Sequence, residues 1–373
     1  MTVKTLVNKT VVIKVGSQSL IDLRNNAAKT KRFAEQINGI ISAGHRLIIV
    51  SSGAVALGLE ILGESPPLSS SAKLQARLAA VGQPELHRWW HSLINYPTAQ
   101  LLLDRTLLET REAFVNTVEV LDSFHRHSII PICNENDAMA HQRSKLGNND
   151  HLAALIAQAT SADWLFLITN TPGVYRDFPN SDEIITNLSD EANDLEECLF
   201  EGKSKLGSGG MGSKVNAARL ASEMGTHVVI GNDELDFGAW LTSGLFAPPE
   251  KIGTWLIASD KSALKRFSWM QHVGKVFGSV TVDDGAKRAL LNSAASLLSV
   301  GIKRVEGVFE ANQVIAILDE QENVIAKGMS RCNATELLKR VTDLNELKQN
   351  KSQKGMRGDV VVHRNDMMLY SSQ

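Results

Sequence analysis

The chain has 373 residues, of which 43% are hydrophobic and 21% charged, a balance typical of a globular protein with about two domains. Its formal net charge is −2, which argues against nucleic-acid binding driven by the field of the whole molecule. Its cysteines, Cys133, Cys198 and Cys332, lie far apart in the sequence, which argues against a disulfide framework or a structural zinc site and suits a reducing compartment.

The first part of the chain alternates between short β-branched runs and helical patterns. Strands are predicted at residues 10–15, 46–50, 128–133, 164–169 and 227–230, and helices at residues 29–43, 111–125, 150–160 and 213–224. Because continuous apolar strands alternate with helices, the pattern predicts an α/β fold, in which helices sandwich a mostly parallel sheet.

The pattern changes after residue 259. Residues 260–276 are largely basic and hydrophilic, and they predict a linker. Short strands are then predicted at residues 279–282, 301–305, 307–310, 314–318 and 324–328, with a helix at residues 286–297. The sequence therefore predicts one domain over residues 1–259 and a second, smaller β-rich domain over residues 277–373.

The most specific local motif is a glycine-rich run at residues 207–214 that opens a predicted helix. Backbone N–H groups in such a loop and the helix dipole favour a phosphate, and Lys214 adds a positive charge. A flexible loop before a helix is the alternative. Gly207, Gly209 and Gly212 also match a dinucleotide-binding fingerprint, but the preceding residues do not form the strand that this fingerprint requires.

Further candidates follow predicted strands, at the edge where ligands of open α/β sheets bind. Lys14 comes near the end of the first strand, and Gly16 after it would let a phosphoryl group approach closely. Ser52 follows the second strand. Its hydroxyl would either hold an anion or cap the next helix, and the sequence favours neither role.

A denser group of polar residues follows the strand at residues 128–133. Residues 134–137 read Asn-Glu-Asn-Asp, and residues 147–150 read Gly-Asn-Asn-Asp. Such carboxamide and carboxylate groups suit the ammonium and carboxylate groups of an amino acid. Asp150 also stands where an acidic residue stabilises a helix N-terminus, so a purely structural role is the alternative for it.

Taken in order, these motifs resemble the amino-acid kinase family, in the arrangement of its members that phosphorylate glutamate. The resemblance is carried by VVIKVGSQSL at 11–20, IIVSSGAVALG at 48–58, LAAVGQPEL at 78–86, PICNENDAMA at 131–140, LGNNDHLAALIA at 146–157, FLITNTPGVY at 166–175 and GSGGMGSKVNAA at 207–218. The segments FGSVTVDDGAKRALL at 277–291 and AKGMSRCNATEL at 326–337 resemble a PUA domain.

The resemblance implies the amino-acid kinase fold and ATP-dependent phosphorylation of the side-chain carboxylate of L-glutamate, the first step of proline biosynthesis. Lys14 and Lys214 would contact the transferring phosphoryl group, and Asp150 would position them. The implied substrate-binding residues are Ser52, Asn134, Asp137 and Asn149. The implied nucleotide-binding residues are Lys14, Thr169, Asn170, Ser208, Gly209, Gly210, Met211, Gly212, Ser213 and Lys214.

The resemblance also implies several partners. Mg²⁺ would arrive with the nucleotide rather than at a metal site built by the protein. Proline would act as a feedback inhibitor, the chain would form a homo-oligomer, and the PUA-like domain would offer a surface for RNA. No signal-peptide pattern or membrane-length apolar run occurs, so a cytoplasmic protein without a membrane is expected. The family usually has Asp where this chain has Asn148 and Asn170.

Two other functions stay open at this point. Another enzyme of the same fold would act on aspartate, acetylglutamate, carbamate or a nucleotide, and the PUA-like tail disfavours this. An RNA-binding or regulatory protein with a decayed kinase site is the second, and the presence of Lys14, Asp150 and Lys214 together disfavours it.

Overall fold

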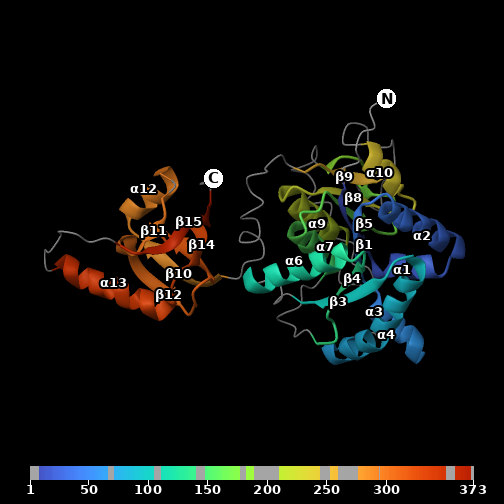
Figure 1. Ribbon diagram of the computed structural model, residues 1–373, viewed down its shortest axis with the longest axis horizontal. Coiled ribbons are helices and arrows are strands. Elements are labelled where there is room, and N and C mark those ends of the chain that lie inside the picture. The colour runs from blue at the N-terminus through green and yellow to red at the C-terminus, as the bar shows by residue number, and fades with distance from the viewer. Residues whose placement is uncertain are drawn as a thin grey trace. The chain divides into compact units, whose positions relative to one another are not determined.

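The computed structural model describes residues 8–65, 71–104, 111–139, 148–176, 182–188, 210–243, 253–258, 276–293, 295–349 and 358–370. The chain divides into two compact units (Figure 1): unit 1 comprises residues 1–107 and 116–265, and unit 2 comprises residues 108–115 and 266–373. Of the predicted linker, residues 260–276, only Val276 is described, so the boundaries predicted from the sequence remain predictions.

Unit 1 is built on a seven-stranded sheet in the order β3-β4-β2-β1-β5-β8-β9. Its strands are β1 (Thr10–Val15), β2 (Arg46–Ser51), β3 (Thr98–Leu103), β4 (Ile130–Glu135), β5 (Trp164–Ile168), β8 (His227–Gly231) and β9 (Thr254–Leu256). Neighbouring strands are parallel except β8 and β9, which confirms the predicted mostly parallel sheet. A small antiparallel pair, β6 (Val174–Tyr175) and β7 (Ile184–Ile185), lies outside this sheet.

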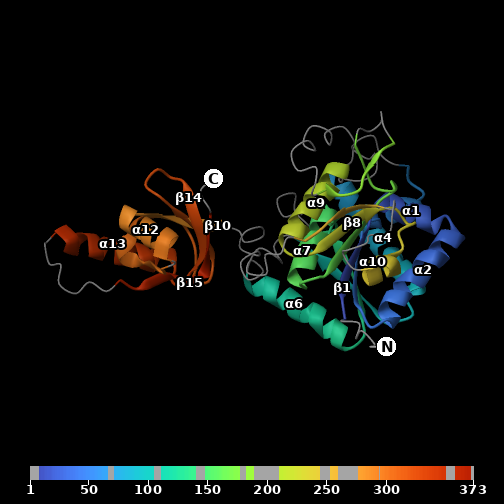
Figure 2. The same ribbon diagram turned by 90° about the horizontal axis from the view of Figure 1, so that it is seen from above.

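Helices cover both faces of the sheet (Figure 2). On one side lie α7 (Asn149–Ala159), α9 (Met211–Glu223) and α6 (Arg111–Arg126), which belongs to unit 1 from Asn116 on. On the other lie α1 (Ser17–Arg24), α2 (Ala27–Ser42), α4 (Ala72–Leu93) and α10 (Phe237–Ser243), and α3 (Ala54–Leu62) packs on α4. None of the helices in the described segments has both the length and the apolar character that a membrane crossing needs.

The alternation of side chains along β1 separates a hydrophobic face from a face that carries charge. Val11, Ile13 and Val15 join the large core that includes Phe33 of α2. Successive strand residues point to opposite faces, so Lys14 is directed to the other side, where α7 packs on β1. The sequence Val-Ile-Lys-Val therefore buries a lysine between the sheet and its helices.

α3 and α4 cross in backbone contact at two glycines. A Cβ on Gly82 would lie 1.9 Å from the carbonyl oxygen of Ala54, and a Cβ on Gly58 would lie 2.1 Å from that of Leu78. A side-chain carbon cannot approach a backbone oxygen so closely, so this crossing requires glycine at both positions. The crossing fixes α4 against the first turn of α3, directly after Gly53.

Unit 2 contains a six-stranded sheet in the order β11-β15-β14-β13-β10-β12, with only β10 and β13 parallel among its paired strands. The elements are β10 (Val276–Val282), α12 (Asp284–Ser293), β11 (Leu297–Leu298), a 3₁₀ turn (Ser299–Gly301), β12 (Ile302–Gly307), β13 (Val314–Leu318), β14 (Val324–Ser330), α13 (Ala334–Gln349) and β15 (Val360–Leu369). The unit has its own hydrophobic core, which includes Val280, Ile317 and Leu337. The predicted β-rich second domain is therefore confirmed.

Several predicted elements of unit 2 differ from the structure. The strand predicted at residues 307–310 is wrong, because β12 ends at Gly307, whose φ is +86°, and Phe309 is a buried loop residue. The predicted helix at residues 286–297 already ends at Ser293, and Leu297 begins β11. The sequence did not predict α13 and β15 of unit 2. In unit 1 it did not predict the edge strands β3 and β9 or helices α1, α3, α4 and α10.

Candidate active site

Strands β1, β2, β4 and β5 are adjacent and parallel, and their carboxyl ends meet at one edge of the unit 1 sheet. Val15 of β1 is level with Ser51 of β2 and with Ile168 of β5. This edge is where ligands of open α/β sheets bind. The predicted site residues at the ends of these strands are Lys14, Ser52, Asn134, Thr169 and Asn170.

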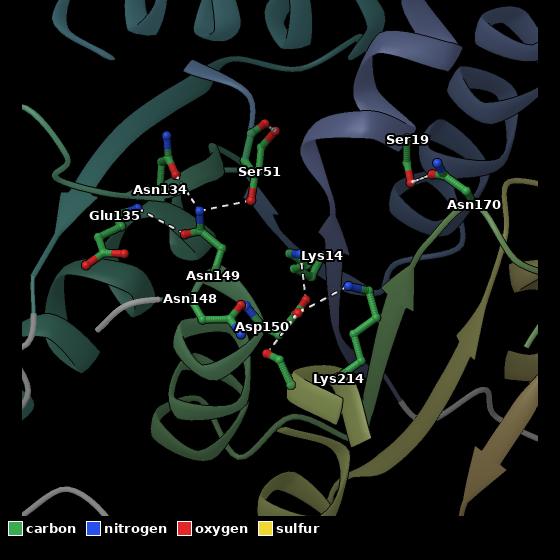
Figure 3. A network of polar contacts seen from close by, with 12 residues as sticks. Lys14, Ser19, Ser51, Asn134, Glu135, Asn148, Asn149, Asp150, Asn170 and Lys214 are labelled. Carbon is green, nitrogen blue, oxygen red and sulfur yellow. Dashed lines mark hydrogen bonds and ion pairs between the residues drawn. The ribbon is translucent and has the colours of Figure 1, made fainter. Parts of the chain in front are cut away.

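Lys14, Asp150 and Lys214 form a buried charged cluster at this edge (Figure 3). Nζ of Lys14 lies 2.5 Å from Oδ1 of Asp150, and Nζ of Lys214 lies 3.3 Å from Oδ2. The Asp150 side chain is 0% exposed, and those of Lys14 and Lys214 are 5% and 9% exposed. The hydroxyl of Ser213 donates to Oδ2 of Asp150 at 3.3 Å. The structure thus brings together the three residues predicted to be catalytic.

The electrostatics of the charged cluster favour an anion. Burial lowers the pKa of Lys14 below its ordinary value, an effect that Asp150 opposes and Lys214 reinforces. Burial alone would raise the pKa of Asp150, but the two ammonium groups hold it below its usual range, so the carboxylate is ionised at neutral pH. The cluster thus sets two amino groups against one carboxylate. A phosphoryl group would add a second negative group to it.

The N-terminus of α9 lies at the charged cluster. Gly210 is the N-cap, and Lys214 follows in the first turn and a half of the helix. No side chain from the described part of the chain caps this end, so its first N–H groups remain available to an anion. The prediction that the glycine-rich run opens a helix is confirmed. Ser208 and Gly209 of that run lie outside the described residues.

Asn149, at the start of α7, is the centre of an amide network (Figure 3). The backbone N–H of Glu135 donates to its Oδ1 at 3.1 Å. Its Nδ2 donates to Oδ1 of Asn134 at 2.9 Å. The same Nδ2 donates to Oγ of Ser52, also at 2.9 Å. Nδ2 of Asn134 in turn donates to Oε1 of Gln83 at 2.8 Å. The amide network (Asn149, Ser52, Asn134 and Gln83) therefore contains three of the four predicted substrate-binding residues.

The structure bears on the alternatives for Ser52 and Asp150. The N-cap of α3 is Gly53, with φ +120°, so the capping role for Ser52 is wrong; its hydroxyl instead accepts from Asn149. Asp150 does lie in the first turn of α7, and it also contacts both lysines of the charged cluster. The cap of α7 is Asn148, whose Oδ1 accepts from the backbone N–H of Asp150 at 2.8 Å.

Asp137, the fourth predicted substrate-binding residue, lies in the turn that follows β4. It is half-buried, and its backbone N–H donates to the carbonyl oxygen of Glu135 at 2.9 Å. Glu135 also donates to Asn149, so the turn that carries Asp137 is joined to the amide network through the backbone. The role of Asp137 in binding stays a prediction.

The residues after β5 lie on the opposite side of Lys14 from the amide network, because β5 and β2 flank β1 on its two sides. The hydroxyl of Ser19, in the first turn of α1, donates to Oδ1 of Asn170 at 2.9 Å (Figure 3). The backbone N–H of Thr169 donates to the carbonyl oxygen of Gly231 at 2.8 Å. A Cβ on Gly16 would lie 3.7 Å from Nζ of Lys14, so this glycine leaves the space beside that ammonium open.

Ser19 and Gln83 were not among the site residues predicted from the sequence. Gln83 had a detectable signal, because it is a polar residue on the face of α4 that also carries the buried Leu86 and Trp90. Ser19 had none, because serine in the first turn of a helix is common. Trp90 also lies close to the site, since its Nε1 donates to Oγ of Ser51 at 2.8 Å.

Comparison with known proteins finds a matching family model for each unit. The model of the amino acid kinase family matches residues 9–232, and the model of the PUA domain matches residues 278–344. A glutamate 5-kinase from Dictyoglomus turgidum is 33% identical over 375 residues, covering 97% of each chain. Glutamate 5-kinases from Klebsiella pneumoniae and Rippkaea orientalis are 35% and 34% identical, covering 97% of this chain and 99% of their own lengths.

Proposed function

The chain belongs to the amino acid kinase family and is similar to glutamate 5-kinases along 97% of its length, and from this premise we propose that it phosphorylates L-glutamate. The γ-phosphoryl group of ATP would pass to the side-chain carboxylate of glutamate. The products are ADP and L-glutamyl 5-phosphate, an acyl phosphate at the start of proline biosynthesis. The observation that carries the proposal is the buried charged cluster, Lys14, Asp150 and Lys214, beside the amide network.

The charged cluster suits the transfer step. A carboxylate oxygen of glutamate attacks the γ-phosphorus, and the bond from that phosphorus to the β,γ-bridging oxygen of ATP breaks. The side-chain carboxylate of glutamate, with an ordinary pKa of about 4.3, is ionised at neutral pH, so the step needs no general base. Asp150 holds both ammonium groups in place before substrate binds, so they stabilise the charge of the transferring group without reorganisation.

The two sides of the sheet edge would hold the two substrates. Ser52, Asn134 and Asn149 lie on the side of β2 and β4, where their amide and hydroxyl groups would bind the amino acid. Thr169 and Asn170 lie on the side of β5, where they would bind the nucleotide together with the start of α9. The reacting groups would then meet above Lys14, between the two sides.

Magnesium would enter with the nucleotide, coordinated mainly by its phosphates and water. In the charged cluster, each carboxylate oxygen of Asp150 already faces an ammonium group. Within the described ranges, no group of three or more His, Cys, Asp or Glu side chains is placed to hold a metal ion. The residues that the structure describes therefore fit a metal carried by phosphates better than a cage of protein ligands.

The remaining expectations concern regulation and partners. The match of residues 278–344 to the PUA domain supports RNA as a ligand of unit 2. Proline as a feedback inhibitor, a homo-oligomer and a place in the cytoplasm remain expectations from the family resemblance.

The direct test is ATP-dependent formation of an acyl phosphate, trapped as its hydroxamate with hydroxylamine. L-Glutamate, L-aspartate and N-acetyl-L-glutamate are compared in the presence of Mg²⁺, with reactions lacking ATP as controls. Hydroxamate is expected with glutamate. Hydroxamate from aspartate or acetylglutamate, and none from glutamate, would assign the site to another amino acid.

We expect Asn170→Asp to change the apparent KM for ATP severalfold and to leave the KM for glutamate nearly unchanged. A carboxylate accepts the hydrogen bond from Ser19 as the amide does, so the local fold is kept while a negative charge appears on the nucleotide side. Steady-state kinetics with each substrate varied in turn measures both constants. A change confined to the KM for glutamate would show that β5 belongs to the amino-acid side.

We expect a fragment of residues 1–259 to fold and keep glutamate-dependent turnover, with altered proline inhibition or assembly. The proposed site residues all precede residue 215, and units 1 and 2 have separate hydrophobic cores. A domain of about 260 residues buries roughly three quarters of its unfolded surface. Solubility, turnover, proline inhibition and oligomeric state are compared with the full chain. An insoluble or inactive fragment would show that unit 1 needs unit 2 for folding.

A further inference from the structure

Gln83 contributes a buried amide group whose NH₂ has no acceptor among the described residues. The residue lies on α4 and is 7% exposed. Its Oε1 accepts from Nδ2 of Asn134 at 2.8 Å. Its Nε2 is buried and finds no acceptor in the structure of the described residues. Because buried donors in folded proteins are nearly always paired, the position of this group points to an acceptor that comes from a ligand.

The orientation of the Gln83 amide follows from a backbone group. The N–H of Glu135 can only donate, so the amide oxygen of Asn149 must face it. The NH₂ of Asn149 then faces the oxygen of Asn134, and the NH₂ of Asn134 faces the oxygen of Gln83. Turning the Gln83 amide over would oppose two NH₂ groups. The unpaired donor at Nε2 is therefore fixed by the whole amide network.

The backbone around Gln83 holds this donor firmly beside the site. The preceding residue, Gly82, is the one that crosses α3 in backbone contact at Ala54. Ala54 is the first residue of α3 and follows Ser52 and Gly53 directly. Gln83 and Ser52 are thus carried by two helices that contact each other at this point, so the donor lies next to the predicted binding residues.

The amide network also shows which end of the substrate the donor faces. Asp150 of the charged cluster is the chain neighbour of Asn149. Asn149 donates a hydrogen bond to Asn134, and Asn134 donates one to Gln83. Gln83 is the member of this series farthest from the charged cluster along the contacts. The reacting carboxylate lies at the charged cluster, so the far end of glutamate carries the α-ammonium and the α-carboxylate. Only the α-carboxylate accepts a hydrogen bond from an NH₂ group.

We propose that Gln83 is a specificity-determining residue whose Nε2 donates to the α-carboxylate of the amino-acid substrate. The assignment rests on the proposed function, because the substrate supplies the acceptor. It explains how the site would distinguish glutamate from a monocarboxylate of the same length, since a buried donor left unpaired disfavours the wrong ligand.

The test combines variants of Gln83 with a ligand that lacks the α-carboxylate. 4-Aminobutanoate keeps the reacting carboxylate and the ammonium group of glutamate, and its affinity is measured by competition in the hydroxamate assay. In Gln83→Met, the KM for glutamate should rise by about 10-fold or more, the loss expected for a hydrogen bond to a charged group. The inhibition constant of 4-aminobutanoate should change much less.

Gln83→Glu refines the test. The new carboxylate can still accept the hydrogen bond from Asn134, but it places a negative charge where Nε2 was. The KM for glutamate should therefore rise more than in Gln83→Met. The KM for ATP should stay unchanged. Gln75→Met, the same change two turns earlier on α4, serves as the matched control and should leave both constants unaltered. Thermal unfolding checks that each variant folds.

Three results would overturn the assignment. An unchanged KM for glutamate in Gln83→Met would mean that water or nothing meets Nε2. An equal loss of affinity for glutamate and 4-aminobutanoate would mean that Gln83 only supports Asn134. Absence of glutamate hydroxamate with the unaltered chain would refute the proposed function itself, and the role of Gln83 with it.

Discussion

Replacing Lys14 or Lys214 with alanine is expected to lower kcat by about 100-fold or more, as for loss of one preorganised electrostatic donor. The KM for glutamate should change little. Both ammonium groups contact Asp150, whereas Asn149 and Asn134 of the amide network would hold the amino acid, so the two lysines are expected to act on the transferring phosphoryl group. An interaction made mainly in the transition state affects kcat and not the binding of substrate.

The measurement is steady-state turnover with each substrate varied, and Lys9→Ala is a suitable control. Lys9 directly precedes the start of β1, at the opposite end of the strand from the site, and its ammonium pairs with Asp163 at 3.3 Å in a partly exposed position. This variant should keep normal turnover. Near-normal kcat in both Lys14→Ala and Lys214→Ala would place the phosphoryl group elsewhere.

Replacing Asp150 with alanine is expected to abolish turnover and to lower the free energy of unfolding by about 3–5 kcal/mol, the usual cost of breaking a buried ion pair. The carboxylate is fully buried between two ammonium groups, so its removal leaves two buried positive charges without a counter-charge. Chemical denaturation of the full chain measures the loss. A decrease below about 1 kcal/mol, the range of exposed ion pairs, would contradict this account.

A second variant separates charge from packing. Lys14→Met removes one of the two ammonium groups, so Asp150→Ala should destabilise the Lys14→Met background less than it destabilises the unaltered chain.

The stability of the folded chain should also depend on pH through Asp150, with a definite sign. The pKa of Asp150 is lowered in the folded state, so its contribution to stability is present above its unfolded pKa and is lost as the pH falls through the folded value.

Local patterns singled out Lys14, Asp150 and Lys214 one by one. Lys14 interrupts an apolar strand, Asp150 opens a helix, and Lys214 follows a glycine-rich run. Their grouping as one site came from the resemblance to the amino-acid kinase family, and the structure brings them together. The resemblance likewise grouped Ser52, Asn134 and Asn149, which the hydrogen bonds of Asn149 join.

Features that depend on packing between distant segments were not predictable in this way. Gln83 of α4 meets Asn134 of β4, 51 residues farther along the chain, and it follows Gly82, where α4 contacts α3; a helical glycine alone does not reveal such a neighbour. The strand predicted at residues 307–310 failed for a local reason. Its apolar residues satisfy the strand pattern, but the positive φ of Gly307 ends β12 and sends Phe309 into the core as a loop residue.

The central position of β1 in the sheet also affects how unit 1 folds during synthesis. β1 is the first strand of the described residues to leave the ribosome, yet one of its partners, β5, ends only at Ile168. At about 5–20 residues per second, a nascent chain that has paired β1 with β2 waits on the order of ten seconds for β5. During that window, one edge of β1 and the ammonium of Lys14 lack the partners, β5 and Asp150, that they have in the folded unit.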